Sequence, residues 1–162
     1  MGIKKTPLYG EHVKLGARMV EFGGWLMPVF YTNVIDEHTA TRQKAGLFDT
    51  CHMGEIMIEG DGAFRLVQKL VTADISKLVK GSIVYCVMCN ENGGTIDDIT
   101  VYCFSDNKYM LVVNAGTVEK DLGWIKKCSS GFDAAVTDKR KELAKLDLQG
   151  PNAEKILQKM TE

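Results

Sequence analysis

The residues most able to do chemistry lie in one short segment, 90–102, where a polar turn precedes an acidic strand. Asn-Glu-Asn-Gly-Gly at 90–94 is rich in residues that tolerate positive φ, which predicts a hairpin turn. In the strand that follows, side chains alternate between two faces, so Asp98, Thr100 and Tyr102 share one face. An acid, a hydroxyl and a phenol in one row can form one wall of a ligand pocket.

Two adjacent acids, Asp97 and Asp98, open this strand. Neighbouring residues of a strand point to opposite faces, which excludes a carboxylate dyad made by these two. Because most acidic side chains are exposed, the pattern alone favours the plain interpretation of two solvated acids beside a turn. A pocket wall that contains Asp98 is the alternative.

The side chains that most often bind metals are scattered along the chain. His12, His38 and His52 lie in separate segments without metal-ligand spacing. Cys86 and Cys89 form a C-x-x-C pair, but in a strand they face opposite ways, whereas a zinc or redox site needs them on a turn or a helix N-terminus. The sequence therefore predicts no metal site. The five cysteines, an odd number, argue for a reducing compartment.

The overall composition is typical of a soluble globular protein, with 45% hydrophobic and 25% charged residues. The net charge is −1 and the signs are interspersed, so there is no electrostatic case for binding nucleic acid or an anionic membrane. No run approaches the roughly 18 apolar residues of a membrane span, and the N-terminus lacks the apolar stretch of a secretory signal. We expect a bacterial cytoplasmic protein, and a mature mitochondrial form would look similar.

The acidic strand belongs to a longer alternation of predicted strands and helices. The pattern over 54–138 predicts the order β-α-β-β-β-α-β, which is the split-βαβ (ferredoxin-like) plan with an added hairpin, and hence an α+β fold. Within it, 82–89 is apolar on both alternating faces and predicts a fully buried strand. We expect Asp61 to cap the first helix and Thr117 to open the second.

The flanking segments predict a second, incomplete body. Residues 4–31 are interrupted by glycine and proline and are expected to be irregular, and a helix is expected over about 33–44. A strand at 143–148 and a helix that starts at Pro151 form a unit with no partner to bury its apolar face. We therefore expect the chain to be the N-terminal part of a longer protein.

Ordered motifs over nearly the whole chain carry a family resemblance. They are TPLY at 6–9, FGGWLMP at 22–28, GLFD at 46–49, HMGE at 52–55, YCVMCN at 85–90, GGTIDD at 93–98, VVNA at 112–115, EKD at 119–121 and LQGP at 148–151. With these motifs the chain resembles the aminomethyltransferase (T-protein) of the glycine cleavage system. Thr50-Cys51 departs from the Val-Ser more usual in that family before the HMGE motif.

The resemblance implies an enzyme that transfers a methylene group to tetrahydrofolate. The donor is an aminomethyl-lipoyl arm on a lipoyl carrier protein (H-protein), and ammonia is released. Asp98 matches the functional aspartate of the family, which can orient the attacking amine, accept its proton and stabilise developing positive charge. Tyr85, Tyr102 and Asn114 match folate-contacting positions, and Met53 matches an apolar contact at the edge of the site. We expect the two tyrosines to shield Asp98 partly from water.

The resemblance also implies a three-domain protein. Residues 1–53 and 140–162 would be parts of a discontinuous first folate-binding domain and 54–139 the second domain, with the third domain absent from this chain. The arginine for the folate tail and a carboxylate for the pterin ring would lie beyond residue 162. The alternatives are a non-catalytic folate-binding protein of the iron–sulfur maintenance type, a folate-dependent demethylase or related oxidising enzyme, and an inactive N-terminal fragment.

Overall fold

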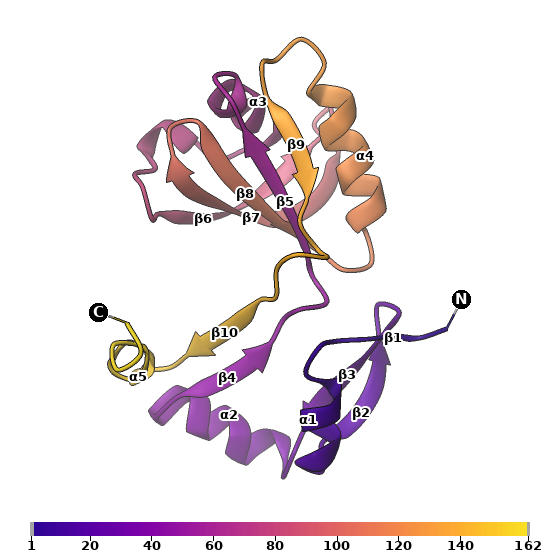
Figure 1. Cartoon of the computed structure of the whole chain (residues 1–162), viewed down its shortest axis with the longest axis vertical. Helices are drawn as coiled ribbons and strands as arrows, with labels where there is room; N and C mark the ends of the chain where they lie inside the picture. The colour runs from indigo at the N-terminus through magenta and orange to yellow at the C-terminus, as the bar shows by residue number, and fades with distance from the viewer. Residues whose placement is uncertain (1, 162) are drawn as a thin grey trace. The chain divides into compact units, whose positions relative to one another are not determined.

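The computed structural model describes residues 2–161, which divide into two compact units. One unit comprises Met1–His52 with Ala144–Glu162, and the other is Met53–Leu143. We describe each unit by itself (Figure 1). Their assignment to the first and second domains of a longer protein stays a prediction.

The Met53–Leu143 unit is built on one five-stranded antiparallel sheet with the order β6-β7-β8-β5-β9. Its elements follow the predicted chain order β-α-β-β-β-α-β, with one short 3-10 helix added, and so confirm an α+β fold. In chain order they are β5 (Gly54–Glu59), α3 (Ala63–Leu70), η1 (Ile75–Lys77), β6 (Ile83–Cys89), β7 (Thr95–Ser105), β8 (Lys108–Val113), α4 (Val118–Cys128) and β9 (Ala135–Asp138).

One face of this sheet packs against α3 and α4 and forms the hydrophobic core. Along β7 the core side chains are Ile99, Val101 and Cys103, the set that strand alternation predicts. Apolar side chains of both helices, among them Leu66 and Ile125, belong to the same buried cluster. The opposite face of β7 carries Asp98, Thr100 and Tyr102 and is left to form a site.

Strand β6 is not fully buried, contrary to the expectation from its apolar sequence. It lies at the edge of the sheet, and its side chains facing away from the helices are open to solvent. Ile83 is 55% exposed and Tyr85 67% exposed, whereas Cys86 and Met88 point into the core. The sequence shows that both faces of the strand are apolar, but α3 and α4 cover only one face of the sheet in this unit.

The two helices of this unit begin differently from one another. Gly62 rather than Asp61 is the N-cap of α3, since the Gly62 carbonyl accepts the Leu66 N–H at 2.9 Å, and no side chain caps this end. Thr117 is the N-cap of α4, as predicted, but its side chain makes no capping hydrogen bond. Its hydroxyl group donates to Asp97 of β7 instead. The start of α4 is thereby tied to the acidic strand.

The other unit holds two small sheets, with the strand orders β1-β3-β2 and β10-β4. Residues 4–31 are not irregular, because a glycine pair closes a hairpin between β2 and β3. Gly23 and Gly24 have φ values of 57° and 82°, which other residues rarely adopt. The elements of this unit are β1 (Lys4–Lys5), α1 (Tyr9–Lys14), β2 (Arg18–Phe22), β3 (Trp25–Phe30), α2 (Val34–Gln43), β4 (Gly46–Asp49), β10 (Leu146–Gln149) and α5 (Ala153–Leu157).

Helix α2 begins as predicted, with the Asn33 side chain accepting the Asp36 N–H at 2.8 Å. At the end of β4, His12 bridges two side chains. Its Nε2 lies 2.8 Å from Asp49 Oδ2, and its Nδ1 lies 2.8 Å from the Tyr31 hydroxyl oxygen. These contacts tie α1, β4 and the segment after β3 together. Within residues 2–161, no helix is long and apolar enough to span a membrane.

Candidate functional site

The predicted hairpin turn is present and is held by one side chain. Asn90 Oδ1 accepts the backbone N–H groups of Asn92 at 3.0 Å and Gly94 at 2.9 Å. Gly93 has a φ of 79°, the conformation that glycine adopts without strain. The turn sets the register in which β7 returns along β6.

Strand register brings the predicted site residues to one face of the sheet, the face opposite α3 and α4. Tyr85 pairs with Thr100, which is two residues from Asp98 and therefore on the same face. Thr100 also pairs with Val112, so the same register places Asn114 across from Asp98. The residues that this face collects from β6, β7, the end of β8 and the start of β5 are Tyr85, Asp98, Tyr102, Asn114 and Met53.

Asp98 is held by two neighbouring side chains. The Tyr85 hydroxyl group donates to Asp98 Oδ2 at 2.7 Å, and Asn114 Nδ2 lies 3.2 Å from Oδ1. The hydrogen bond to Asp98, followed by desolvation, raises the pKa of Tyr85, which keeps its hydroxyl group a donor. Asp98 is nevertheless exposed, and the expected partial shielding by Tyr85 and Tyr102 stays a prediction. The carboxylate is oriented on both oxygens while remaining open to a ligand.

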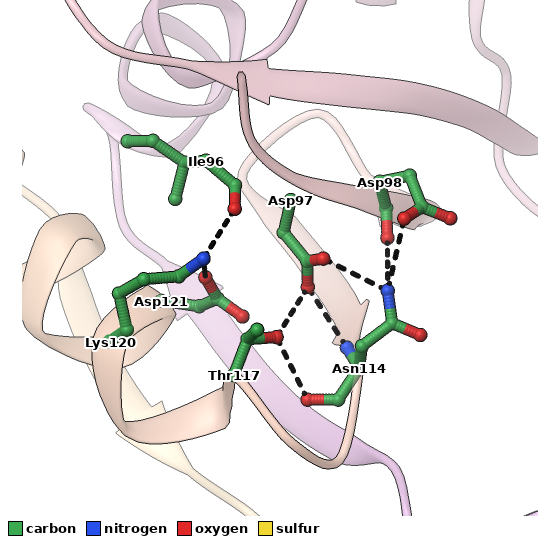
Figure 2. A network of polar contacts seen from close by, with 7 residues as sticks. All are labelled: Ile96, Asp97, Asp98, Asn114, Thr117, Lys120 and Asp121. Atoms are coloured by element: carbon green, nitrogen blue, oxygen red, sulfur yellow. Dashed lines mark hydrogen bonds and ion pairs between the residues drawn. The ribbon is translucent and has the colours of Figure 1, made fainter. Parts of the chain in front are cut away.

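Asp97 lies on the other side of the strand and is buried, which overturns the interpretation of two solvated acids. Its Oδ1 accepts Asn114 Nδ2 at 2.9 Å, and its Oδ2 accepts the Asn114 backbone N–H at 3.1 Å and the Thr117 hydroxyl group at 2.9 Å (Figure 2). Burial acts to raise the pKa of Asp97, but these donors outweigh it and lower that pKa. Asp97 is therefore an ionised, hydrogen-bonded acid inside the fold.

Asn114 connects the two acids. Its Nδ2 faces Asp97 Oδ1, Asp98 Oδ1 and the Asp98 carbonyl oxygen at 2.9, 3.2 and 3.1 Å. Three acceptors around one nitrogen fix which end of the amide is which. The side-chain oxygen of Asn114 points away from both aspartates in Figure 2. The site thus offers an oriented acceptor beside an oriented carboxylate.

Met53 and Tyr102 flank this arrangement rather than contacting Asp98 by hydrogen bonds. Met53 directly precedes Gly54, which pairs with Val113, so it lies level with Asn114. Tyr102 pairs with Ile83 and Met110 on neighbouring strands. Both are half-buried, so each presents part of an apolar side chain at the edge of the face.

Two further polar residues near the site were not predicted as part of it, Asp121 and Lys120 of α4. The Lys120 ammonium group donates to the Ile96 carbonyl at 2.5 Å and lies 3.8 Å from Asp121 Oδ1 (Figure 2). A sequence signal for Asp121 exists, because it falls within the apolar stripe formed by Val118, Leu122 and Ile125. An acid at such a position predicts a buried carboxyl group.

The predicted site residues lie on the open face of the sheet and do not line the larger cavities. Cavities of about 540, 440 and 410 Å³ lie in the other unit, and none of the five predicted site residues lines any of them. A smaller cavity, of about 280 Å³, lies between β6 and β7 and has Tyr102 on its wall. Within residues 2–161, no group of three or more His, Cys, Asp and Glu side chains is placed to hold a metal ion.

Comparison with known proteins gives one consistent result. Residues 8–162 match the sequence profile described as the GCVT N-terminal domain. The chain is 49% identical to the aminomethyltransferase of Halothermothrix orenii over 98% of its own length and 44% of that protein. It is 52% identical to the aminomethyltransferase of Moorella thermoacetica over 98% of its own length and 43% of that protein.

A solved structure shows the same fold. It is the crystal structure of glycine cleavage system aminomethyltransferase T from Bartonella henselae, 36% identical in sequence, with a TM-score of 0.89. The match covers 98% of this chain and 44% of that chain. The chain therefore spans less than half the length of the relatives it matches.

Proposed function

The chain belongs to the GCVT N-terminal domain family of aminomethyltransferases, and on that premise we propose that it supplies the reacting carboxylate of a tetrahydrofolate-dependent aminomethyltransferase. The proposed reaction transfers a methylene group from an aminomethyl-lipoyl carrier protein to tetrahydrofolate and releases ammonia, as part of glycine catabolism. The matched curated relatives named above are bacterial, which supports a cytoplasmic location in a bacterium.

The observation that carries the proposal is the carboxylate of Asp98, exposed yet held on both oxygens. Tyr85 and Asn114 fix its orientation at 2.7 and 3.2 Å without enclosing it. A carboxylate presented in this way can align an amine, accept a proton from it and stabilise positive charge that develops nearby. Asp98 would perform these steps, and Tyr85 and Asn114 would hold its carboxylate in the required orientation.

The surroundings of Asp98 suit the chemical nature of a reduced folate. The exposed ring of Tyr85 and the half-buried ring of Tyr102 offer aromatic surface on the same face. The side-chain oxygen of Asn114 is free to accept an N–H group, because its nitrogen is already committed to Asp97 and Asp98. Met53 would contribute a soft apolar contact at the edge. When bound, tetrahydrofolate supplies the nucleophilic amine of the transfer.

Asp98→Asn in the full-length protein tests the proposal. We expect kcat to fall by about 100-fold or more, because an amide cannot accept the proton, while the Kd for tetrahydrofolate changes by less than about threefold. Asp106→Asn is the matched control, since Asp106 is an exposed acid in the turn after β7. Tyr85→Phe removes one support of Asp98 and is expected to give a smaller loss of kcat, about 10-fold.

Turnover by Asp98→Asn at the wild-type rate would refute the assignment of Asp98. If the unaltered full-length protein bound tetrahydrofolate but released no ammonia from the aminomethyl-lipoyl carrier, the non-catalytic folate-binding alternative would replace the enzyme.

A further inference from the structure

A buried carboxyl group lies behind the site and has no role in the proposed chemistry. Asp121, on α4, is fully buried, and within residues 2–161 neither of its oxygens accepts a hydrogen bond from a donor. Figure 2 shows its carboxyl group on the side of α4 that carries Thr117 and faces Asp97. A buried ionised carboxylate in this position would be costly, because burial and a neighbouring negative charge both oppose ionisation.

A proton on Asp121 resolves this conflict. The single hydrogen of the Thr117 hydroxyl group is already taken by Asp97 Oδ2 at 2.9 Å and the Asn114 carbonyl oxygen at 3.2 Å, so the hydroxyl oxygen can still accept. A protonated Asp121 has one O–H group, whose hydrogen Asp97 or Thr117 can accept. Burial first, and then Asp97, raises the pKa of Asp121 to about 7, although the contact with Thr117 acts to lower it. Asp97, which receives three hydrogen bonds from Asn114 and Thr117, is the partner that stays ionised.

We propose that Asp97 and Asp121 share one proton across the contact between β7 and α4 and thereby act as positioning residues for Asp98. The proton holds the Asp97 carboxylate in position, and Asp97 in turn orients the side-chain amide of Asn114. That amide contacts the Asp98 carboxylate. Figure 2 shows the Asp97 carboxylate joined to both Thr117, at the start of α4, and the Asn114 amide. The link to catalysis rests on the proposed function, whereas the shared proton does not.

The pair gives the site a dependence on pH. The charged groups that face Asp121 are Asp97 from β7 and Lys120 from its own helix, whose ammonium group lies 3.8 Å from Oδ1. When the shared proton leaves, Lys120 opposes only part of the repulsion between two buried carboxylates, because it is also bonded to the Ile96 carbonyl. Asp97 then shifts, the Asn114 amide loosens, and Asp98 loses one of its two supports.

The first test uses carboxyl ¹³C NMR on aspartate-labelled chain from pH 5 to 9. We expect Asp121 to titrate near pH 7 and the Asn114 side-chain amide signals to move with the same midpoint. In Asp121→Asn, which carries a neutral donor in place of the proton, the Asn114 signals should stay at their low-pH position. Asp61→Asn is the control, because Asp61 is exposed and its side chain makes no hydrogen bond within the described residues.

Two NMR results would overturn the proposal, and neither depends on folding of a variant. One is an Asp121 carboxyl group that titrates below about pH 5, as an unperturbed aspartate does. The other is an Asn114 amide that does not respond when Asp121 titrates. The first would remove the shared proton, and the second would break its link to the site.

The second test measures kcat/KM of the full-length protein against pH. We expect the kcat/KM of Asp121→Asn, divided by that of the wild type, to rise by about tenfold between pH 6 and 9, because only the wild type has a proton to lose at position 121. A constant ratio would refute the positioning role even if the NMR titration were seen. A full-length wild type without aminomethyltransferase activity would refute the proposed function instead, and the NMR test would still decide on the pair.

Discussion

The pH dependence of stability gives a quantitative test of the buried acid at position 121. Burial, together with Asp97, raises the pKa of Asp121 from 3.8 to about 7. Between these values the folded chain retains a proton that the unfolded chain has released, so the free energy of unfolding falls as pH rises. The slope is about 1.4 kcal/mol per pH unit, and the total is about 4 kcal/mol by pH 8.

Asp121→Asn isolates this contribution. The amide is neutral at every pH, has nearly the same volume and can donate to Asp97. Relative to this variant, wild type is expected to lose about 3 kcal/mol of unfolding free energy between pH 5 and 8. Urea unfolding followed by the fluorescence of Trp124, in a Trp25→Phe background, reports on the unit that holds the pair. Asp61→Asn provides the exposed control.

Two results would refute this reasoning. Parallel pH dependence in wild type and Asp121→Asn would mean that Asp121 does not retain its proton on folding. A variant that is less stable than wild type by the same amount at pH 5 and 8 would mean that the amide disturbs packing and that titration plays no part.

Two further predictions concern packing and the other unit. Gly54→Ala should lower the free energy of unfolding by about 1–3 kcal/mol in urea titrations, because the new Cβ would come 2.4 Å from a valine methyl group of α4. Gly123→Ala is the control and should not destabilise the chain, because nothing lies within 4 Å of its Cβ position. Equal effects of the two substitutions would contradict the argument. Burial acts to raise the pKa of Asp49, but hydrogen bonds from Cys51 and His12 outweigh it and lower that pKa to about 2. The ionised Asp49 therefore stabilises the fold fully above about pH 4, and this stabilisation is lost as pH falls towards 2. Asp49→Asn should therefore cost about 2 kcal/mol at pH 7 in urea unfolding followed by the fluorescence of Trp25, in a Trp124→Phe background, because Trp25 lies in the same unit as Asp49. An unchanged midpoint would refute it.

Local pattern was sufficient to predict the strand that carries the site. Alternation placed Asp98 and Tyr102 on the face opposite Ile99, and the structure agrees. The glycines within 4–31 predict irregular backbone when they are read as interruptions, but the adjacent pair Gly23 and Gly24 also suits the two-residue turn that joins β2 and β3.

Strand pairing and helix packing determine two features that the local sequence pattern does not predict. The edge position of β6 follows from which strands pair across the sheet, and that pairing involves residues far apart in sequence. The position of Asp121 on the side of α4 that faces Asp97 likewise depends on how α4 packs against the sheet. Strand periodicity correctly separated Asp97 from Asp98, but it could not show that a carboxyl group of a helix lies near Asp97.

Because Asp97 and Asp98 lie on opposite faces of the strand, a substitution on α4 is expected to affect the site around Asp98. Once Asp98 faces the open side of the sheet, alternation forces Asp97 towards the core. A buried carboxylate is tolerated only when its oxygens are hydrogen-bonded, and Asn114 supplies two of the three donors. The same side-chain nitrogen, which carries two hydrogens, also contacts Asp98, so one amide holds both acids. We therefore expect a change in charge on α4 to alter how firmly Asn114 holds Asp98, although α4 packs on the other face of the sheet.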